Sequence, residues 1–134
     1  MADDITLTQP DLINRLRNNL PSGYTDAKFK KPNFKFTTPK NSKWLRATVI
    51  TFETESDAAT GACTITRGLF VIDVLFPLGS GDNLQLLDAQ EIRDLYKNQT
   101  FGNTQCQTVS VETIGESESW YIIQLNVNFY MSGF

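Results

Sequence analysis

The strongest constraint in this sequence is the segment from Gly68 to Phe76, which reads Gly-Leu-Phe-Val-Ile-Asp-Val-Leu-Phe. Its β-branched and aromatic residues favour a strand, and the nearly continuous apolar run indicates that both faces are buried at its centre. The cluster Pro77-Leu-Gly-Ser-Gly81 follows at once and ends the strand. We therefore expect a strand over residues 63–76, inside a sheet that other elements cover.

The remaining elements follow from periodicity and end signals. Residues 44–53, 106–114 and 120–131 have strand character, and in 120–131 apolar residues alternate with Gln and Asn. Capping boxes at Thr8 and Asp82 open helices over 6–20 and 82–96. The segment 115–119, which contains Glu116 and Glu118, joins the last two strands as an acidic hairpin loop. We expect one α+β domain over 1–134: a mostly antiparallel sheet of four or slightly more strands, with an N-terminal and a central helix packed on it.

Residues 24–43 have no clear period, and we treat them as an arm that is partly strand. Basic and aromatic residues interleave here, from Lys28 to Phe36, between two prolines. Three interpretations stay open. The Phe residues anchor a loop while the Lys side chains are solvated, or the arm binds another protein, or it binds single-stranded nucleic acid by stacking and phosphate contacts.

The charge is strongly divided along the chain, although the net charge is only −3. Residues 1–46 hold nine Lys or Arg against four Asp or Glu, a net +5, and residues 47–134 hold three against eleven, a net −8. Such asymmetry predicts a basic surface that meets something acidic. Nucleic acid, another protein and another copy of the chain all fit this description.

Most catalytic mechanisms are excluded by composition. The chain has no His, so it lacks the usual triads, imidazole metal ligands and near-neutral proton shuttles, and its two Cys have no CxxC spacing. The apolar strand contains one acid, Asp73, which we expect to form a structural charge pair with Arg67, or with Arg46 as the alternative partner. No second carboxylate at a suitable spacing completes an acid/base pair. We predict no enzyme activity, no cofactor and no metal.

The sequence also shows no signal for membrane insertion or export. No run reaches the ~18 apolar residues of a membrane span, and the first residues are acidic where a signal peptide is basic. We expect a soluble protein of the cytoplasm, with no membrane partner and no specific nucleic-acid recognition.

Several segments together resemble a known family. A helix and a Pro-rich arm precede Trp44-Leu-Arg46; then Thr66-Arg-Gly leads through the apolar strand and Pro77-Leu-Gly-Ser-Gly81 into a helix. The chain closes on Trp120-Tyr-Ile-Ile-Gln-Leu-Asn-Val-Asn-Phe129. This layout resembles the tail terminator, or tail completion, proteins of long-tailed, non-contractile bacteriophages.

The resemblance implies a virion structural protein with two assembly partners, the tail tube protein and the head–tail connector protein. It implies a hexameric ring at the head-proximal end of the tail, which ends tube polymerisation and presents the surface for head attachment. Assembly would take place in the host cytoplasm. Alternatives are another head–tail adaptor ring protein or, in a different class, a single-stranded nucleic-acid-binding domain that uses the arm.

A ring needs two different surfaces on each subunit that fit each other, and the divided charge can supply them. We hypothesise that cations of one copy meet acids of a neighbouring copy or of the tube. The cations are Lys28, Lys30, Lys31, Lys35 and Arg46, and the acids are Glu53, Glu55, Asp57, Glu116 and Glu118. Because exposed charge pairs are screened within about 10 Å at 0.1 M salt, high salt should dissociate such a ring.

Overall fold

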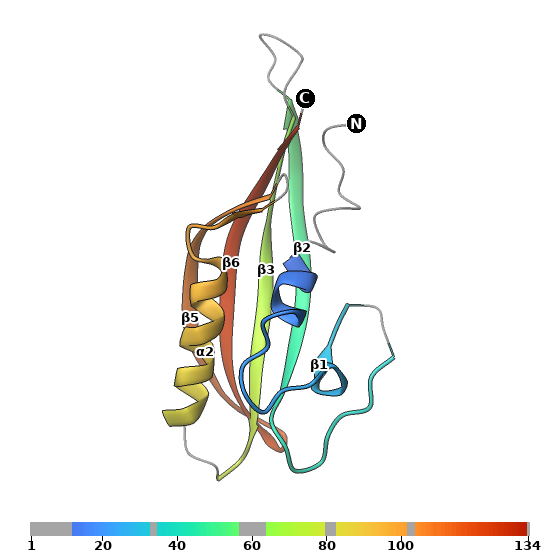
Figure 1. Ribbon diagram of the computed structural model, residues 1–134, viewed down its shortest axis with the longest axis vertical. Coiled ribbons are helices and arrows are strands. Elements are labelled where there is room, and N and C mark those ends of the chain that lie inside the picture. Colours follow the sequence, from blue (N-terminus) through green and yellow to red (C-terminus); the bar gives the residue numbers. More distant parts are fainter. Residues whose placement is uncertain (1–11, 33–34, 57–63, 80–82, 102–103, 134) are drawn as a thin grey trace.

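The computed structural model of the chain describes residues 12–32, 35–56, 64–79, 83–101 and 104–133. It contains a six-stranded sheet in the order β1-β2-β3-β6-β5-β4 (Figure 1). The strands are β1 (Phe29–Lys30), β2 (Trp44–Ser56), β3 (Thr64–Pro77), β4 (Thr100–Phe101), β5 (Thr104–Ser117) and β6 (Trp120–Gly133). β1 pairs with β2 in parallel, and the other neighbours pair antiparallel. The mostly antiparallel sheet is confirmed, and β1 and β4 are the short strands that the sequence pattern did not resolve.

The helices confirm the α+β class. Residues 12–17 are helical, and the predicted start of this N-terminal helix lies outside the described residues. A short 3₁₀ helix, η1 (Asp26–Lys28), precedes β1, and α2 (Asn83–Tyr96) lies between β3 and β4. The N-terminal helix and α2 lie on the same face of the sheet (Figure 1).

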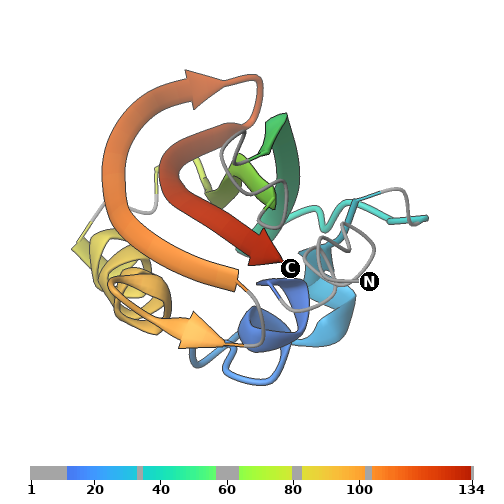
Figure 2. The same cartoon turned by 90° about the horizontal axis from the view of Figure 1, so that it is seen from above.

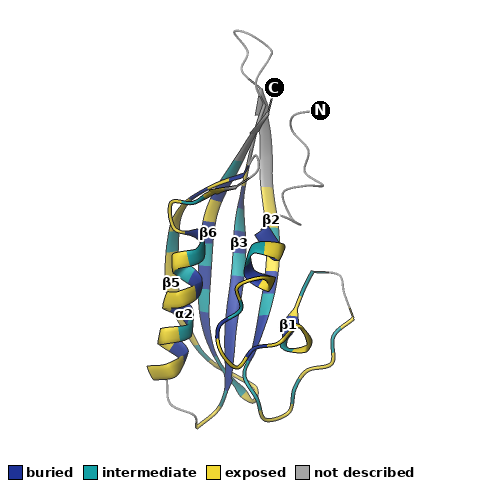
Figure 3. Ribbon diagram, viewed as in Figure 1, coloured by how far each residue is buried: buried dark blue, intermediate teal, exposed yellow. Residues whose placement is uncertain are grey.

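The main core lies between this face and the two helices. Because β2, β3 and β6 are in register, apolar rows such as Leu45, Val74 and Ile123 cross the sheet side by side. α2 turns Ala89 and Ile92 towards these rows, and both are at most 1% exposed. The outer side of the same helix is exposed (Figure 3). Side chains from both helices and three long strands thus form one continuous apolar cluster.

Among the described residues, the opposite face of the sheet is covered at one end. There Trp44, Leu75 and Ile122 form a second buried cluster, against which Phe36 of the arm packs. Further along the strands the rows become polar or half-apolar, and on β2 Ile50 is 43% exposed. The predicted burial of both faces of β3 therefore holds for its C-terminal end, around Leu75.

Two bulges bend the outer half of the sheet. The register between β5 and β6 shifts between Cys106 and Val109, and again between Thr113 and Gly115, where Gly115 has a φ of 95°. An extra residue in one strand increases local twist and bend, and the curvature of β5 and β6 is plain in Figure 2. The predicted loop over 115–119 is wrong in length: β5 continues to Ser117.

Candidate assembly surfaces

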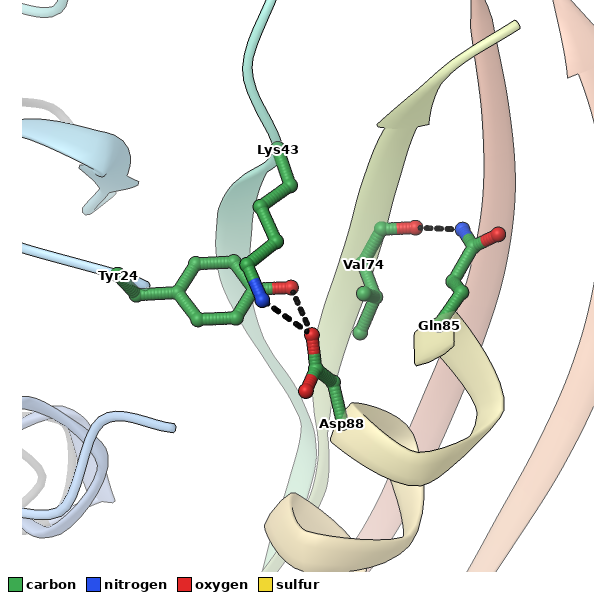
Figure 4. A network of polar contacts seen from close by, with 5 residues as sticks. All are labelled: Tyr24, Lys43, Val74, Gln85 and Asp88. Atoms are coloured by element: carbon green, nitrogen blue, oxygen red, sulfur yellow. Dashed lines mark hydrogen bonds and ion pairs between the residues drawn. The ribbon is translucent and has the colours of Figure 1, made fainter. Parts of the chain in front are cut away.

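The Asp88 carboxylate on α2 binds the two ends of the arm, Tyr24 and Lys43 (Figure 4). The Tyr24 hydroxyl donates a 2.9 Å hydrogen bond to Asp88 Oδ2, and Lys43 Nζ lies 2.9 Å from the same oxygen. The Lys43 ammonium also lies 4.5 Å from the centroid of the Tyr24 ring, within the range of a cation–π contact. The first and last residues of the arm thus bind one atom, and the arm is a loop with both ends fixed.

Burial and a neighbouring glycine accompany this contact between Tyr24, Lys43 and Asp88. Burial raises the pKa of the Tyr24 hydroxyl above its ordinary value, and the neighbouring Asp88 carboxylate adds to the shift. Gly23 has a φ of 91°, and a Cβ there would lie 2.8 Å from Lys43 Cε. The positive φ favours glycine at this position, and an added Cβ would also displace the end of the Lys43 side chain.

The structure divides the predicted cations of the arm into two groups. Lys31 Nζ lies 3.1 Å from Asp26 Oδ1, and Arg17 binds the same carboxylate, so Lys31 has a partner within its own chain. Lys28, Lys30 and Lys35 form no ion pair with any residue of the described ranges, and Lys30 and Lys35 are exposed. Of the predicted cations, these three therefore have no ion-pair partner among the described residues.

One pocket brings together three of the residues that the sequence proposed for an interface. Lys30, Arg46 and Glu118 line a hollow of about 290 Å³ beside Trp44 and Trp120. The two indole rings meet edge to face, with centroids 5.7 Å apart. Opposite charges therefore already lie close together within a single chain, at the end of the sheet that the arm covers.

Asp73 has a partner, but Arg67 is not that partner. The Asp73 carboxylate is 5% exposed and accepts hydrogen bonds of 2.9 Å from Arg46 Nε and from Gln124 Nε2. Arg46 and Gln124 are its direct neighbours on β2 and β6. Arg67 stands six residues away along the same strand, roughly 20 Å at ~3.3 Å per residue, which is beyond the reach of its side chain. The alternative pairing with Arg46 is the one that forms.

The predicted acids lie in different places. Glu53 and Glu55 belong to β2, the strand next to β1, and so share a sheet edge with the basic arm. Asp57 lies outside the described residues. Glu116 near the end of β5 and Glu118 in the following turn are both exposed. Among the predicted acids with described side chains, Glu116 and Glu118 are thus the exposed ones.

Sequence reasoning missed two features of this surface. One is Asp88, whose partners lie 64 and 45 residues away along the chain. The other is a set of exposed leucines on and just before the first two turns of α2. They are Leu78, Leu84, Leu86 and Leu87, at 43%, 64%, 44% and 54% exposure. The spacing of Leu84 and Leu87, off the buried side of the helix, was the available signal.

The described residues offer little for chemistry. Within them, no three Cys, Asp or Glu side chains are grouped in a way that could hold a metal ion. Burial raises the pKa of the Cys106 thiol to about 12, so this thiol is protonated and unreactive at neutral pH. No helix in the described part of the chain is long and apolar enough to cross a membrane.

Comparison with known proteins now gives these surfaces a context. A search of curated proteins finds no significant match. One solved chain superimposes with a TM-score of 0.69 at 23% sequence identity, over 91% of this chain and 94% of the other, which supports the fold alone. A family model described as "Phage tail terminator protein" matches residues 12–129. The chain therefore belongs to the phage tail terminator family and is a structural protein of the phage tail.

Proposed function

We propose that the protein forms a ring on the head-proximal end of the tail tube, where it ends tube polymerisation and provides the surface for head attachment. Its partners are further copies of itself, the tail tube protein and a head–tail connector protein. The ring is hexameric, as the family resemblance implies. No residue is catalytic in this role, and the protein acts through contact surfaces alone.

The observation that carries this proposal is the uncovered face of the sheet. In the part of the chain that the structure describes, both helices lie on the other face and the arm covers the end near Trp44. Beyond that end, Thr48, Val71 and Asn126 form one row and Ile50, Leu69 and Asn128 the next. A wide, half-apolar sheet face with small polar side chains is suited to docking against another protein.

Fewer of the predicted charged residues contact a neighbour in this proposal, because some of them pair within their own chain. Lys28, Lys30 and Lys35 reach the neighbour, while Arg46 and Lys31 hold their own chain together. On the acidic side Glu116 and Glu118 are available, and Glu53, Glu55 and Asp57 remain proposed contacts to the tube. Screening by salt should act on this set.

The proposal is tested by assembling tail tubes from purified tube protein with and without this chain. By negative-stain electron microscopy, tubes should continue to elongate without the protein and should stop elongating once it is added, so that capped tubes are shorter at equal times. Tubes that grow equally long in both samples contradict the proposed role.

The same sample separates the nucleic-acid alternative. Filter binding to single-stranded DNA across a salt series should show weak binding with a shallow slope. High affinity with a steep dependence on salt would instead assign the arm to phosphate contacts.

A further inference from the structure

The exposed leucines of α2 belong to neither core cluster of the described residues. The buried side of the helix is made by Gln85, Ala89, Ile92 and Tyr96, whereas Leu84 and Leu87 lie on the outer side at 64% and 54% exposure. Leu86, at 44%, lies between these two sides. Apolar groups gathered in this way on a small protein indicate a surface that a partner covers. We call Leu84 and Leu87, which lie together on the outer side, the leucine surface.

Acidic side chains accompany the leucine surface. Glu91 and Asp94 continue the outer side of α2 one and two turns further on, and both are exposed. A partner for this surface should therefore combine apolar groups with positive charge.

The same chain presents such a surface on its other side. Along the arm, Lys30, Lys35 and Lys40 are exposed, while Pro32 and Pro39 are half-buried among them. Lys30, Lys35 and Lys40 have no ion-pair partner among the described residues. The arm therefore offers cations with apolar groups between them.

The two surfaces also have the relative position that a ring requires. β1 and the arm lie at one edge of the sheet, and α2 packs on β3, β6 and β5, towards the other edge. Figures 1 and 2 agree that α2 and the outer part of the arm lie on opposite sides of the molecule. A contact between two different patches on opposite sides repeats head to tail and can close into a ring.

We infer that the leucine surface of one copy binds the arm of the next copy, with Lys30 and Lys35 facing Glu91 and Asp94. This inference deepens the proposed ring, on which it rests, by naming the contact between neighbouring subunits. The contact belongs to the chain itself and should form without the tail tube.

Two complementary variants test this arrangement. Leu84→Ser with Leu87→Ser removes the leucine surface but keeps the arm, and Lys30→Glu with Lys35→Glu reverses the arm but keeps the leucine surface. Each variant alone should be monomeric by light scattering, whereas the unmodified chain forms rings. Mixed in equal amounts, the two variants should form heterodimers and no rings, because each pair retains one intact contact. Lys97→Glu is the matched charge control on the same segment and should leave ring formation unchanged. Circular dichroism should show that all variants are folded.

Three results would overturn the inference. They are an unmodified chain that stays monomeric at every concentration, a leucine variant that still forms rings, and a mixture that stays monomeric. Failure of the proposed function is a separate outcome. Rings that depend on this contact but do not limit tube length would refute the terminator role and leave the contact in place.

Discussion

Replacing Asp88 by Ala should destabilise the protein strongly and release the arm. The substitution removes the acceptor shared by the Tyr24 hydroxyl and the Lys43 ammonium, each 2.9 Å away. Hydrogen bonds to a charged group contribute about 1.5–3 kcal/mol each. Asp88 and Lys43 are 15% and 25% exposed, so water recovers part of this energy. We expect a loss of about 3 kcal/mol, and at about 3 °C per kcal/mol for this size a fall in Tm of roughly 9 °C.

The assay is urea unfolding followed by circular dichroism, combined with limited trypsin digestion. The free energy of unfolding should fall with an unchanged m-value, and cleavage in the Lys-rich arm should become faster because the fixed ends are released. Asp94→Ala on the same helix is the control. Its side chain is 62% exposed and 3.5 Å from Arg93, so its loss should stay below about 0.5 kcal/mol. Equal stability of the two variants would refute the assignment of Asp88 as the clamp of the arm.

Three further substitutions or treatments test the core. Gly68→Ala should abolish folding or cost more than about 3 kcal/mol in urea unfolding, because the added Cβ would lie 2.3 Å from the Ile50 carbonyl oxygen. Tyr96→Phe should cost about 1–2 kcal/mol, since the buried hydroxyl donates to the Leu12 carbonyl at 2.6 Å. Burial raises the pKa of Tyr96 above its ordinary value. Its contribution to the free energy of unfolding is therefore complete below pH 10 and is lost above pH 10 at about 1.4 kcal/mol per pH unit. Tyr96→Phe should make the free energy of unfolding fall less steeply between pH 10 and 11. Cys106, with a pKa of about 12, should react with a thiol reagent at pH 8 only in urea, as peptide mass mapping would show.

The sheet was predictable because its signals are local. The alternation along residues 120–131 correctly indicates one covered and one uncovered face, and the apolar run before Pro77 marks the central strand. The strand order and the pairing of β1 with β2 are not local, since Phe29 meets Leu45 only in the folded chain. The hairpin loop was predicted too long because two of its residues adopt backbone geometry that the sequence pattern does not reveal. Gly115 forms a bulge, and Glu118 takes a φ of 56° at the turn.

The assembly surface was less predictable because charge was counted without knowing which charges pair. A strand residue such as Asp73 has candidate partners all along the sequence, and only register selects Arg46 over Arg67. The arm looked unstructured because its fixing contact with Asp88 spans 45 and 64 residues. Tertiary pairing of this kind leaves no period in the sequence.

The ion pairs within the chain change how strongly salt should dissociate the ring. Of the basic residues in the first part of the chain, Arg17, Lys31, Lys43 and Arg46 bind carboxylates of their own chain. Fewer charges than the net +5 suggests are therefore left for a neighbour, and the leucine surface supplies the other part of the contact. Sodium chloride at 1 M should weaken the ring by screening. Ammonium sulfate of equal ionic strength should weaken it less, because sulfate strengthens apolar association. Light scattering in the two salts measures the difference, and equal dissociation in both would show that charge alone holds the subunits together.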